Sequence, residues 1–193
     1  MNKHLAIVID QDRCIGCEAC SVACRIENNT QLFYINVETQ GGENKDTPQG
    51  KFPDLNLNFL PKLCNHCENP PCEESCPVNA IIRRDDGIVF LDRDLCTGCR
   101  ACLEACPYGI IVFNENTNIA EKCNLCSHRI DNDMEPFCVI CCEAQALFFG
   151  DLNDPNSKVS QLVSQRDTFR LKIEENTNPS ICYCLPKPKR RFS

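Results

Sequence analysis

The sequence predicts an α+β fold made of two small, similar modules, one nested within the other, with a loop insertion and an extended C-terminal tail. Three observations support this prediction. The chain has 193 residues, which allows one compact domain or two small similar ones. Most of its nineteen cysteines fall into short C-x2-C runs that recur four times along the chain. Short apolar segments typical of strands separate these runs.

Four cysteine motifs carry the clearest chemical signal. The first is Cys14, Cys17, Cys20 and Cys24, and the third is Cys96, Cys99, Cys102 and Cys106, followed by Pro107. Both match the C-x2-C-x2-C-x3-C run of bacterial ferredoxins. The second motif, Cys64, Cys67, Cys72 and Cys76, and the fourth, Cys123, Cys126, Cys138 and Cys142, keep the x3 ending but have a longer middle gap.

This spacing suits iron–sulfur clusters. Three thiolates on one tight loop cover three iron corners of a 4Fe–4S cubane, and the fourth cysteine lies a helical turn onward and binds the neighbouring cluster. Sixteen cysteines in four such motifs therefore predict four 4Fe–4S clusters. A structural zinc protein is the alternative, but zinc ligands usually come as two separated pairs. Disulfide frameworks spread their cysteines to join distant segments, which is not the pattern here.

The motifs can pair in two ways. Sequential pairing joins the first with the second and the third with the fourth. Nested pairing joins the second with the third, and the first with the fourth around them. The linkers favour nesting, because residues 80–94 predict a strand, a turn at Asp85-Asp86-Gly87 and a second strand, whereas residues 25–63 are long and irregular.

Nested pairing fixes the boundaries and the ligands. The outer module is residues 1–30 and 114–150, the insertion is 31–60, the inner module is 61–113, and the tail is 151–193. The predicted ligand sets, in order, are Cys14, Cys17, Cys20 and Cys142; Cys24, Cys123, Cys126 and Cys138; Cys64, Cys67, Cys72 and Cys106; and Cys76, Cys96, Cys99 and Cys102.

Other elements follow from local patterns. Residues 5–10 (LAIVID) predict a strand, and residues 110–113 and 146–150 predict strands that close the two modules. Residues 156–165 predict a short helix after Pro155, the insertion predicts loop and short strands, and residues 167–185 predict an extended segment that wraps the domain or a partner.

Three cysteines remain outside the ligand sets. We expect Cys141 to be a small buried apolar residue, because the x3 rule selects Cys142 as the ligand. Cys182 and Cys184 lie two apart and so on one face of a strand, where we expect them to pack. A redox pair or a fifth metal site is the alternative for these two.

Among the other polar residues, His66 lies between Cys64 and Cys67, and we expect it to donate a hydrogen bond near a cluster. His128 and Arg129 follow Cys126 and are candidates for the same role; a solvated surface position is the alternative for all three. No catalytic constellation and no glycine-rich phosphate loop is evident, so we expect a protein that is not itself an enzyme.

Charge and hydropathy exclude several classes. A net charge of −7 disfavours nucleic acid as the main partner. No run of about 18 apolar residues predicts a membrane span. The N-terminal residues carry no twin-arginine pair or apolar signal, so we expect no export signal in this chain.

The motifs and their flanks resemble the iron–sulfur subunit of the dimethyl sulfoxide reductase family of molybdenum enzymes. Beyond the cysteines, the resemblance includes CRIENN at 24–29, FPDLNLNFLPKLCNHCENPPC at 52–72, DGIVFLDRDLCTGCRACLEACPYG at 86–109 and KCNLCSHR at 122–129. The segment GDLNDPNSKVSQL at 150–162 is most similar to the branch that serves polysulfide, tetrathionate and arsenate reductases.

The resemblance implies an electron-transfer subunit. Its four clusters would pair as described above and form a wire between a large catalytic subunit with molybdopterin guanine dinucleotide and a membrane quinone-binding subunit or another redox partner. We expect the tail to dock on the catalytic subunit, since it adds no ligand and has little predicted core. The complex would be exported folded, with a partner that carries a twin-arginine signal, to the outer face of the cytoplasmic membrane; otherwise it is cytoplasmic.

Two departures from the family bear on this interpretation. Family members commonly have Ala-Cys-Pro at residues 141–143 and aromatic residues where Cys182 and Cys184 stand. Some relatives hold a 3Fe–4S cluster after losing a ligand of the third motif, but all four cysteines are present here.

Two other functions are alternatives to this interpretation: a four-cluster subunit of a hydrogenase or carbon monoxide dehydrogenase system, and a free ferredoxin-type carrier.

Overall fold

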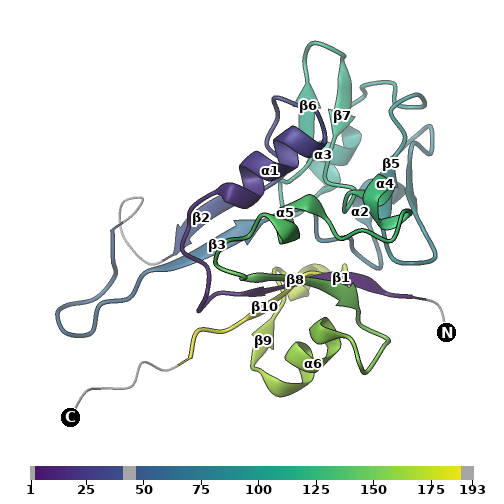
Figure 1. Cartoon of the computed structure of the whole chain (residues 1–193). Coiled ribbons are helices and arrows are strands. Elements are labelled where there is room, and N and C mark those ends of the chain that lie inside the picture. The colour runs from purple at the N-terminus through teal and green to yellow at the C-terminus, as the bar shows by residue number, and fades with distance from the viewer. Residues whose placement is uncertain (1–2, 41–46, 188–193) are drawn as a thin grey trace.

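The computed structural model describes residues 3–40 and 47–187 and contains a four-stranded mixed sheet (Figure 1). Its strands, in spatial order, are β8 (Leu147–Asp151), β1 (Leu5–Asp10), β10 (Cys182–Cys184) and β9 (Thr168–Phe169). Strand β1 runs antiparallel to β8 and parallel to β10. The sheet therefore joins segments that are far apart in the sequence.

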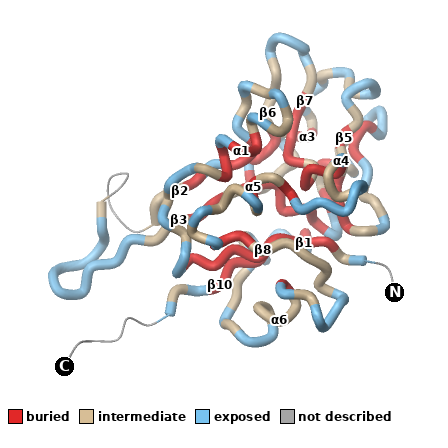
Figure 2. The backbone as a smooth tube through the Cα atoms, in the orientation of Figure 1, coloured by how far each residue is buried: buried red, intermediate tan, exposed pale blue. Residues whose placement is uncertain are grey.

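Strand β1 is the apolar centre of this sheet and is buried along its whole length (Figure 2). Both faces are covered, which explains why LAIVID is a continuous apolar run and not an alternating one. Ile7 and Ile9 belong to the main core, while Val8 packs with Val159 of helix α6 (Lys158–Gln165). The strand predicted at 5–10 and the helix predicted near 156–165 are both confirmed.

Each cysteine motif contributes a short helix. Helix α1 (Ala19–Glu27) follows the loop of the first motif, α2 (Pro71–Glu74) lies in the second and α3 (Ala101–Ala105) in the third. The fourth contains α4 (Ser127–Ile130) and α5 (Phe137–Ile140). Helix α1 packs against α5, and α2 packs against α3.

Three antiparallel hairpins complete the cysteine-bearing half. Strands β4 (Ile81–Arg83) and β5 (Val89–Leu91) form the hairpin predicted at residues 80–94. Strands β2 (Asn36–Gln40) and β3 (Asn58–Lys62) pair across the insertion, where the sequence predicted loop and short strands. Strand β6 (Val112–Asn114) pairs with β7 (Ile119–Glu121), a hairpin that the sequence prediction of a single strand at 110–113 did not include.

The C-terminal segment differs from its prediction. It is extended, with one short 3-10 helix, η1 (Ile173–Glu175), but it is not peripheral. Strand β10 lies between β1 and β9, and Ile181, Tyr183 and Cys184 are completely buried. The expectation that this segment has little core is therefore wrong, because its last strand completes the central sheet. Among the described residues, no helix is long and apolar enough to cross a membrane.

Candidate metal centres

The loops of the first and third motifs share one backbone conformation. Gly16 and Gly98 have φ values of 69° and 73°, and Glu18 and Arg100, directly before the helices, have 59° and 64°. A Cβ at Gly98 would stand 2.2 Å from the Asn118 carbonyl oxygen, so only glycine fits there. These left-handed residues wrap the chain tightly enough for three cysteines to face a common centre.

The second and fourth motifs share a backbone conformation and a hydrogen bond at their final cysteine. The final sulfur of each accepts a backbone N–H: Ala80 donates to Cys76 Sγ and Ala146 to Cys142 Sγ, both at 3.2 Å. The residues before those donors, Asn79 and Gln145, have positive φ values of 51° and 49°. Hydrogen bonds of this kind stabilise thiolate charge at a metal centre.

Thiols of the first and fourth motifs lie close to one another. Burial, with smaller contributions from Cys14 and Cys142, raises the pKa of Cys20 to about 12. Burial, with smaller contributions from Cys126 and Cys20, raises the pKa of Cys24 to about 12. Burial raises the pKa of Cys138 well above its ordinary value, with further contributions from Cys126 and Cys24.

Thiols of the second and third motifs form corresponding groups. Burial raises the pKa of Cys72 to about 12, with contributions from Cys64 and Cys106. Burial raises the pKa of Cys102 to about 11, with contributions from Cys96, Cys99 and Cys76. In both cases one neighbour is the last cysteine of the other motif.

A small cavity lies among the second of these groups. Its lining includes Cys76, Cys96, Cys99 and Cys102 together with apolar side chains such as Ile81 and Leu91. Three of these cysteines come from the third motif and one from the second. They are the four residues predicted to share a cluster.

The donor set fits a cluster in chemistry, because cysteine thiolates are the ligands of 4Fe–4S cubanes. Among the described residues, no three side chains of His, Cys, Asp or Glu lie close enough to hold a single metal ion. A cubane presents its irons at separate corners, so its thiolates stand farther apart than the ligands of one ion. The raised pKa values mean that the buried thiols are neutral without metal and must release protons when they bind it.

Unpartnered polar atoms beside Cys64 also fit a cluster. His66 is completely buried, and its Nδ1 accepts the N–H of Val89 at 3.0 Å, so the neutral ring carries its proton on Nε2. Burial, and then the charge of Lys122, holds the pKa of His66 well below its ordinary value. His66 Nε2 and both polar atoms of the Asn65 side chain are buried without a partner in the described chain. Cluster sulfides would accept hydrogen bonds from His66 Nε2–H and from the Asn65 side-chain N–H.

The other two polar candidates, His128 and Arg129, share one partner. His128 Nε2 donates to the Glu27 carboxylate at 2.7 Å, and Arg129 pairs with the same carboxylate at 3.2 Å. The His128 side chain is half exposed, the Arg129 side chain is 17% exposed and His66 is buried, so the surface alternative holds for His128 only.

Several sulfur contacts come from residues that the sequence patterns did not single out. Thr177 donates a hydrogen bond to the Cys67 sulfur, and its hydroxyl also bonds Tyr108 at 2.5 Å. Asn28 Nδ2 lies 3.6 Å from Cys24 Sγ, and Lys122 Nζ lies 3.6 Å from Cys64 Sγ. Lys122, directly before Cys123, and Asn28, four residues after Cys24, lie next to a motif in the sequence, whereas Thr177 is brought in by the long-range course of the chain.

The three spare cysteines divide into two kinds. Cys182 and Cys184 are buried and pack with Val8 and Val159, which confirms their predicted packing role. Cys141 is only half-buried and caps α5, so its predicted burial is wrong.

The chain matches known proteins over most of its length. Residues 55–152 match a family model described as a 4Fe-4S dicluster domain, and residues 13–80 match a second model with the same description. A protein of Halobacterium salinarum that is named as an iron-sulfur subunit of dimethyl sulfoxide reductase is 44% identical, over 93% of this chain and 78% of its own length.

Two further relatives are parts of other reductases. A subunit of the tetrathionate reductase of Salmonella typhimurium is 41% identical over 92% of this chain and 71% of its own length. The iron-sulfur subunit of the arsenate respiratory reductase of a Shewanella species is 34% identical over 93% of this chain and 95% of its own length.

Proposed function

Because the chain belongs to the family of iron–sulfur subunits that carry 4Fe–4S dicluster domains and serve respiratory reductases, we propose that it relays electrons between a molybdopterin catalytic subunit and a second redox partner. It is an electron-transfer subunit and not the catalytic one. The bound clusters supply one-electron carriers, and the protein holds them, shields them from water and sets their potentials.

The ligand sets that we propose are the four nested ones. The first is Cys14, Cys17, Cys20 and Cys142; the second is Cys24, Cys123, Cys126 and Cys138; the third is Cys64, Cys67, Cys72 and Cys106; the fourth is Cys76, Cys96, Cys99 and Cys102. The cavity lined by all four members of the fourth set carries this proposal. The packing of α1 on α5 and of α2 on α3 supports it, because sequential pairing needs the opposite partners.

The burial of the ligands supports a linear order of the clusters. Cys17 of the first set and Cys99 of the fourth are exposed, whereas all four ligands of the second set are buried. Cys123 of the second set has Cys64 of the third among its close neighbours. We therefore propose that electrons enter and leave at the first and fourth sets and cross the molecule through the second and third.

The two ends have surfaces suited to partners. Ile15, beside Cys14 and Cys17, is 62% exposed, and Leu95, beside Cys96, is 53% exposed. Apolar rims around exposed ligands would exclude water when a partner docks. We propose that the catalytic subunit covers one end and that a quinone-linked subunit or another donor covers the other. A hydrogenase or carbon monoxide dehydrogenase partner is not favoured, since the relatives described above serve reductases.

For the location, we propose that the folded subunit leaves the cytoplasm bound to a partner with a twin-arginine signal. The signal sequence of the partner tests this proposal. A catalytic subunit encoded without such a signal would place the complex in the cytoplasm.

Metal analysis tests the central proposal. The protein purified without oxygen should contain about sixteen iron atoms and sixteen acid-labile sulfides per chain, and should co-purify with a much larger molybdopterin subunit. Stoichiometric zinc with little iron would contradict the assignment of clusters, and a full iron content without any large partner would contradict the assignment of a subunit.

A further inference from the structure

A buried lysine lies where the second and third ligand sets meet. Lys122 directly precedes Cys123 and is 6% exposed. Its Nζ lies 3.6 Å from Cys64 Sγ, donates to the Cys123 carbonyl oxygen at 2.9 Å and also bonds the Val89 carbonyl oxygen. One ammonium group therefore contacts ligand residues of two different sets.

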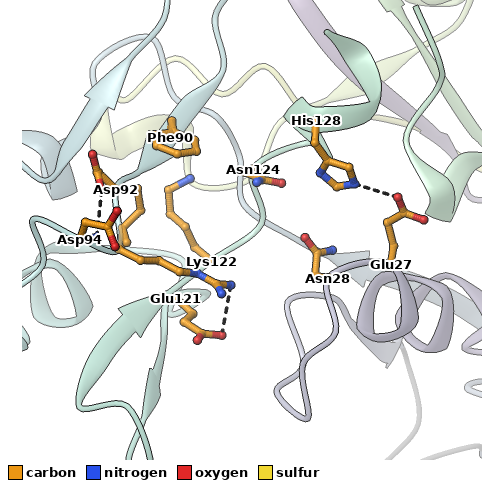
Figure 3. Close-up of a pocket in the computed structure, with 11 residues that line it drawn as sticks. Glu27, Asn28, Phe90, Asp92, Asp94, Glu121, Lys122, Asn124 and His128 are labelled. Atoms are coloured by element: carbon orange, nitrogen blue, oxygen red, sulfur yellow. Dashed lines mark hydrogen bonds and ion pairs between the residues drawn. The ribbon is translucent and has the colours of Figure 1, made fainter. Parts of the chain in front are cut away.

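The surroundings of Lys122 form a pocket between α1, β5 and β7, which we call the junction pocket (Figure 3). The Lys122 side chain runs toward the strand that carries Phe90, while the adjacent Glu121 points the other way. Glu121 is engaged by Tyr34, Asn114 and Arg93. This is the alternation expected of neighbours on a strand, and it separates the two charges.

The ammonium group has hydrogen-bond partners but no counter-charge from a carboxylate. Within residues 3–40 and 47–187, its partners are two carbonyl oxygens and a sulfur. These three acceptors can satisfy its three donors, but none of them is a carboxylate, although Glu27, Asp92, Asp94 and Glu121 also line the pocket. Thiolates that bind a cluster carry the negative charge that this position lacks.

We propose that Lys122 raises the reduction potential of the cluster held by Cys64, Cys67, Cys72 and Cys106, and so favours electron transfer across the junction. The inference rests on the proposed function. Transfer across the junction moves one electron from the second set to the third, and no bond forms or breaks. An added electron increases the negative charge beside Cys64, and a fixed positive charge stabilises that state.

The geometry predicts that Lys122 shifts the reduction potential of the third set's cluster more than that of the second set's cluster. The ammonium group touches the Cys64 sulfur itself, whereas on the other side it reaches only the Cys123 backbone oxygen. Because Coulomb energy falls with distance, the third set gains more than the second. Lys122 therefore acts on the reduction potential of this cluster through the Cys64 sulfur and is not itself a ligand.

The test is a redox titration of the anaerobically purified full-length protein, followed by electron paramagnetic resonance. Lys122→Met should keep about sixteen irons and should lower the potential of one cluster, with at least a tenfold change in its reduction equilibrium, equivalent to 59 mV for one electron. Lys122→Arg, which keeps the charge, should restore most of the shift. Lys51→Met is the matched control, since it removes the same charge from an exposed position in the insertion and should change no potential.

The outcomes separate this inference from the proposed function. Wild-type protein without four cubanes would contradict the proposed function itself. Full iron content with all four potentials unchanged in Lys122→Met would overturn only the role of Lys122. If Lys122→Met loses iron, Lys122→Gln provides the second measurement, because it keeps hydrogen-bonding capacity without charge. Loss of iron in both variants would make Lys122 a structural residue and overturn the inference.

Discussion

Adjacent cysteines in the fourth motif have different surroundings. Cys142 Sγ accepts the Ala146 N–H at 3.2 Å, and Cys142 is a close neighbour of Cys14 and Cys20. Cys141 is half-buried at the end of α5, where its N–H bonds the Phe137 carbonyl oxygen at 3.0 Å. At the residue scale, the direction in which each side chain leaves the helix separates a proposed ligand from a spacer.

This difference leads to a paired prediction. Cys142→Ala should damage the cluster shared with Cys14, Cys17 and Cys20 and remove up to about four irons per chain. Cys141→Ala should keep about sixteen irons and change stability by no more than about 1 kcal/mol, because it deletes one half-buried sulfur. Iron and acid-labile sulfide per chain measure both effects. The reverse result would show that the register of the fourth motif is wrong by one residue.

At the scale of elements, the C-terminal segment holds the loop of the second motif in place. Ser180 donates its N–H to the Asn65 carbonyl oxygen at 2.9 Å and its hydroxyl to the His66 carbonyl oxygen at 2.7 Å. Thr177 bonds the Cys67 sulfur and accepts the Asn69 N–H at its carbonyl oxygen. The segment therefore braces a metal-binding loop, whatever it also does toward a partner.

The brace predicts the effect of truncation. A chain that ends at Asn176 should lose the cluster held by Cys64, Cys67, Cys72 and Cys106, because the loop loses its hydrogen bonds and the sheet loses β10. A chain that ends at Lys187 keeps every described contact of the segment and is the control. Iron content of the two chains provides the measurement, and equal values would contradict the brace.

A milder variant keeps this test informative if the shorter chain does not fold. Thr177→Val should leave the iron content unchanged but should lower the potential of that one cluster, because it removes a hydrogen bond to the Cys67 sulfur. Unchanged potentials would limit Thr177 to a structural role.

The same segment shows where prediction from sequence stops. The hairpin at 80–94, the LAIVID strand and helix α6, which ends at Gln165, were predictable because each pattern is local. The spacing of Cys182 and Cys184 predicted a strand, but no local pattern shows that this strand, β10, pairs in parallel with β1 at the other end of the chain. The Thr177 contact depends on that pairing. The cysteine motifs could be recognised because the spacing of ligands is local. The burial of Cys141 was predicted wrongly because it depends on tertiary packing.

At the scale of the whole molecule, a surface ion pair joins the two proposed modules. Arg84, at the turn of the β4–β5 hairpin, forms two bonds to Asp131 after α4, at 2.7 and 3.1 Å. Hydrogen bonding to Arg84 lowers the pKa of Asp131. A lowered pKa gives stabilisation that is present above the ordinary Asp value and is lost as pH falls through the lowered value.

A double-mutant cycle measures this contact. Asp131→Asn and Arg84→Met should show a coupling of about 0.2–1 kcal/mol, since both side chains are partly exposed and screened by solvent. The coupling should stay constant from pH 5 to 8, where Asp131 is ionised, and should weaken at high salt. Thermal unfolding under anaerobic conditions provides the readout. The more exposed pair Arg100 and Glu115 is the control, and an equal coupling there would contradict a special role for the module contact.

The position of β1 in the sheet has a consequence during synthesis. Strand β1 ends at Asp10, but its two neighbours begin at Leu147 and Cys182. At typical elongation rates, roughly ten to thirty-five seconds pass before the last neighbour leaves the ribosome. Both edges of LAIVID are unpaired until β8 emerges, and one edge stays unpaired until β10 emerges; an apolar strand with a free edge is the kind of segment that associates with other chains. Nascent chains of this protein should therefore depend on a chaperone that shields residues 5–10 until the sheet can close.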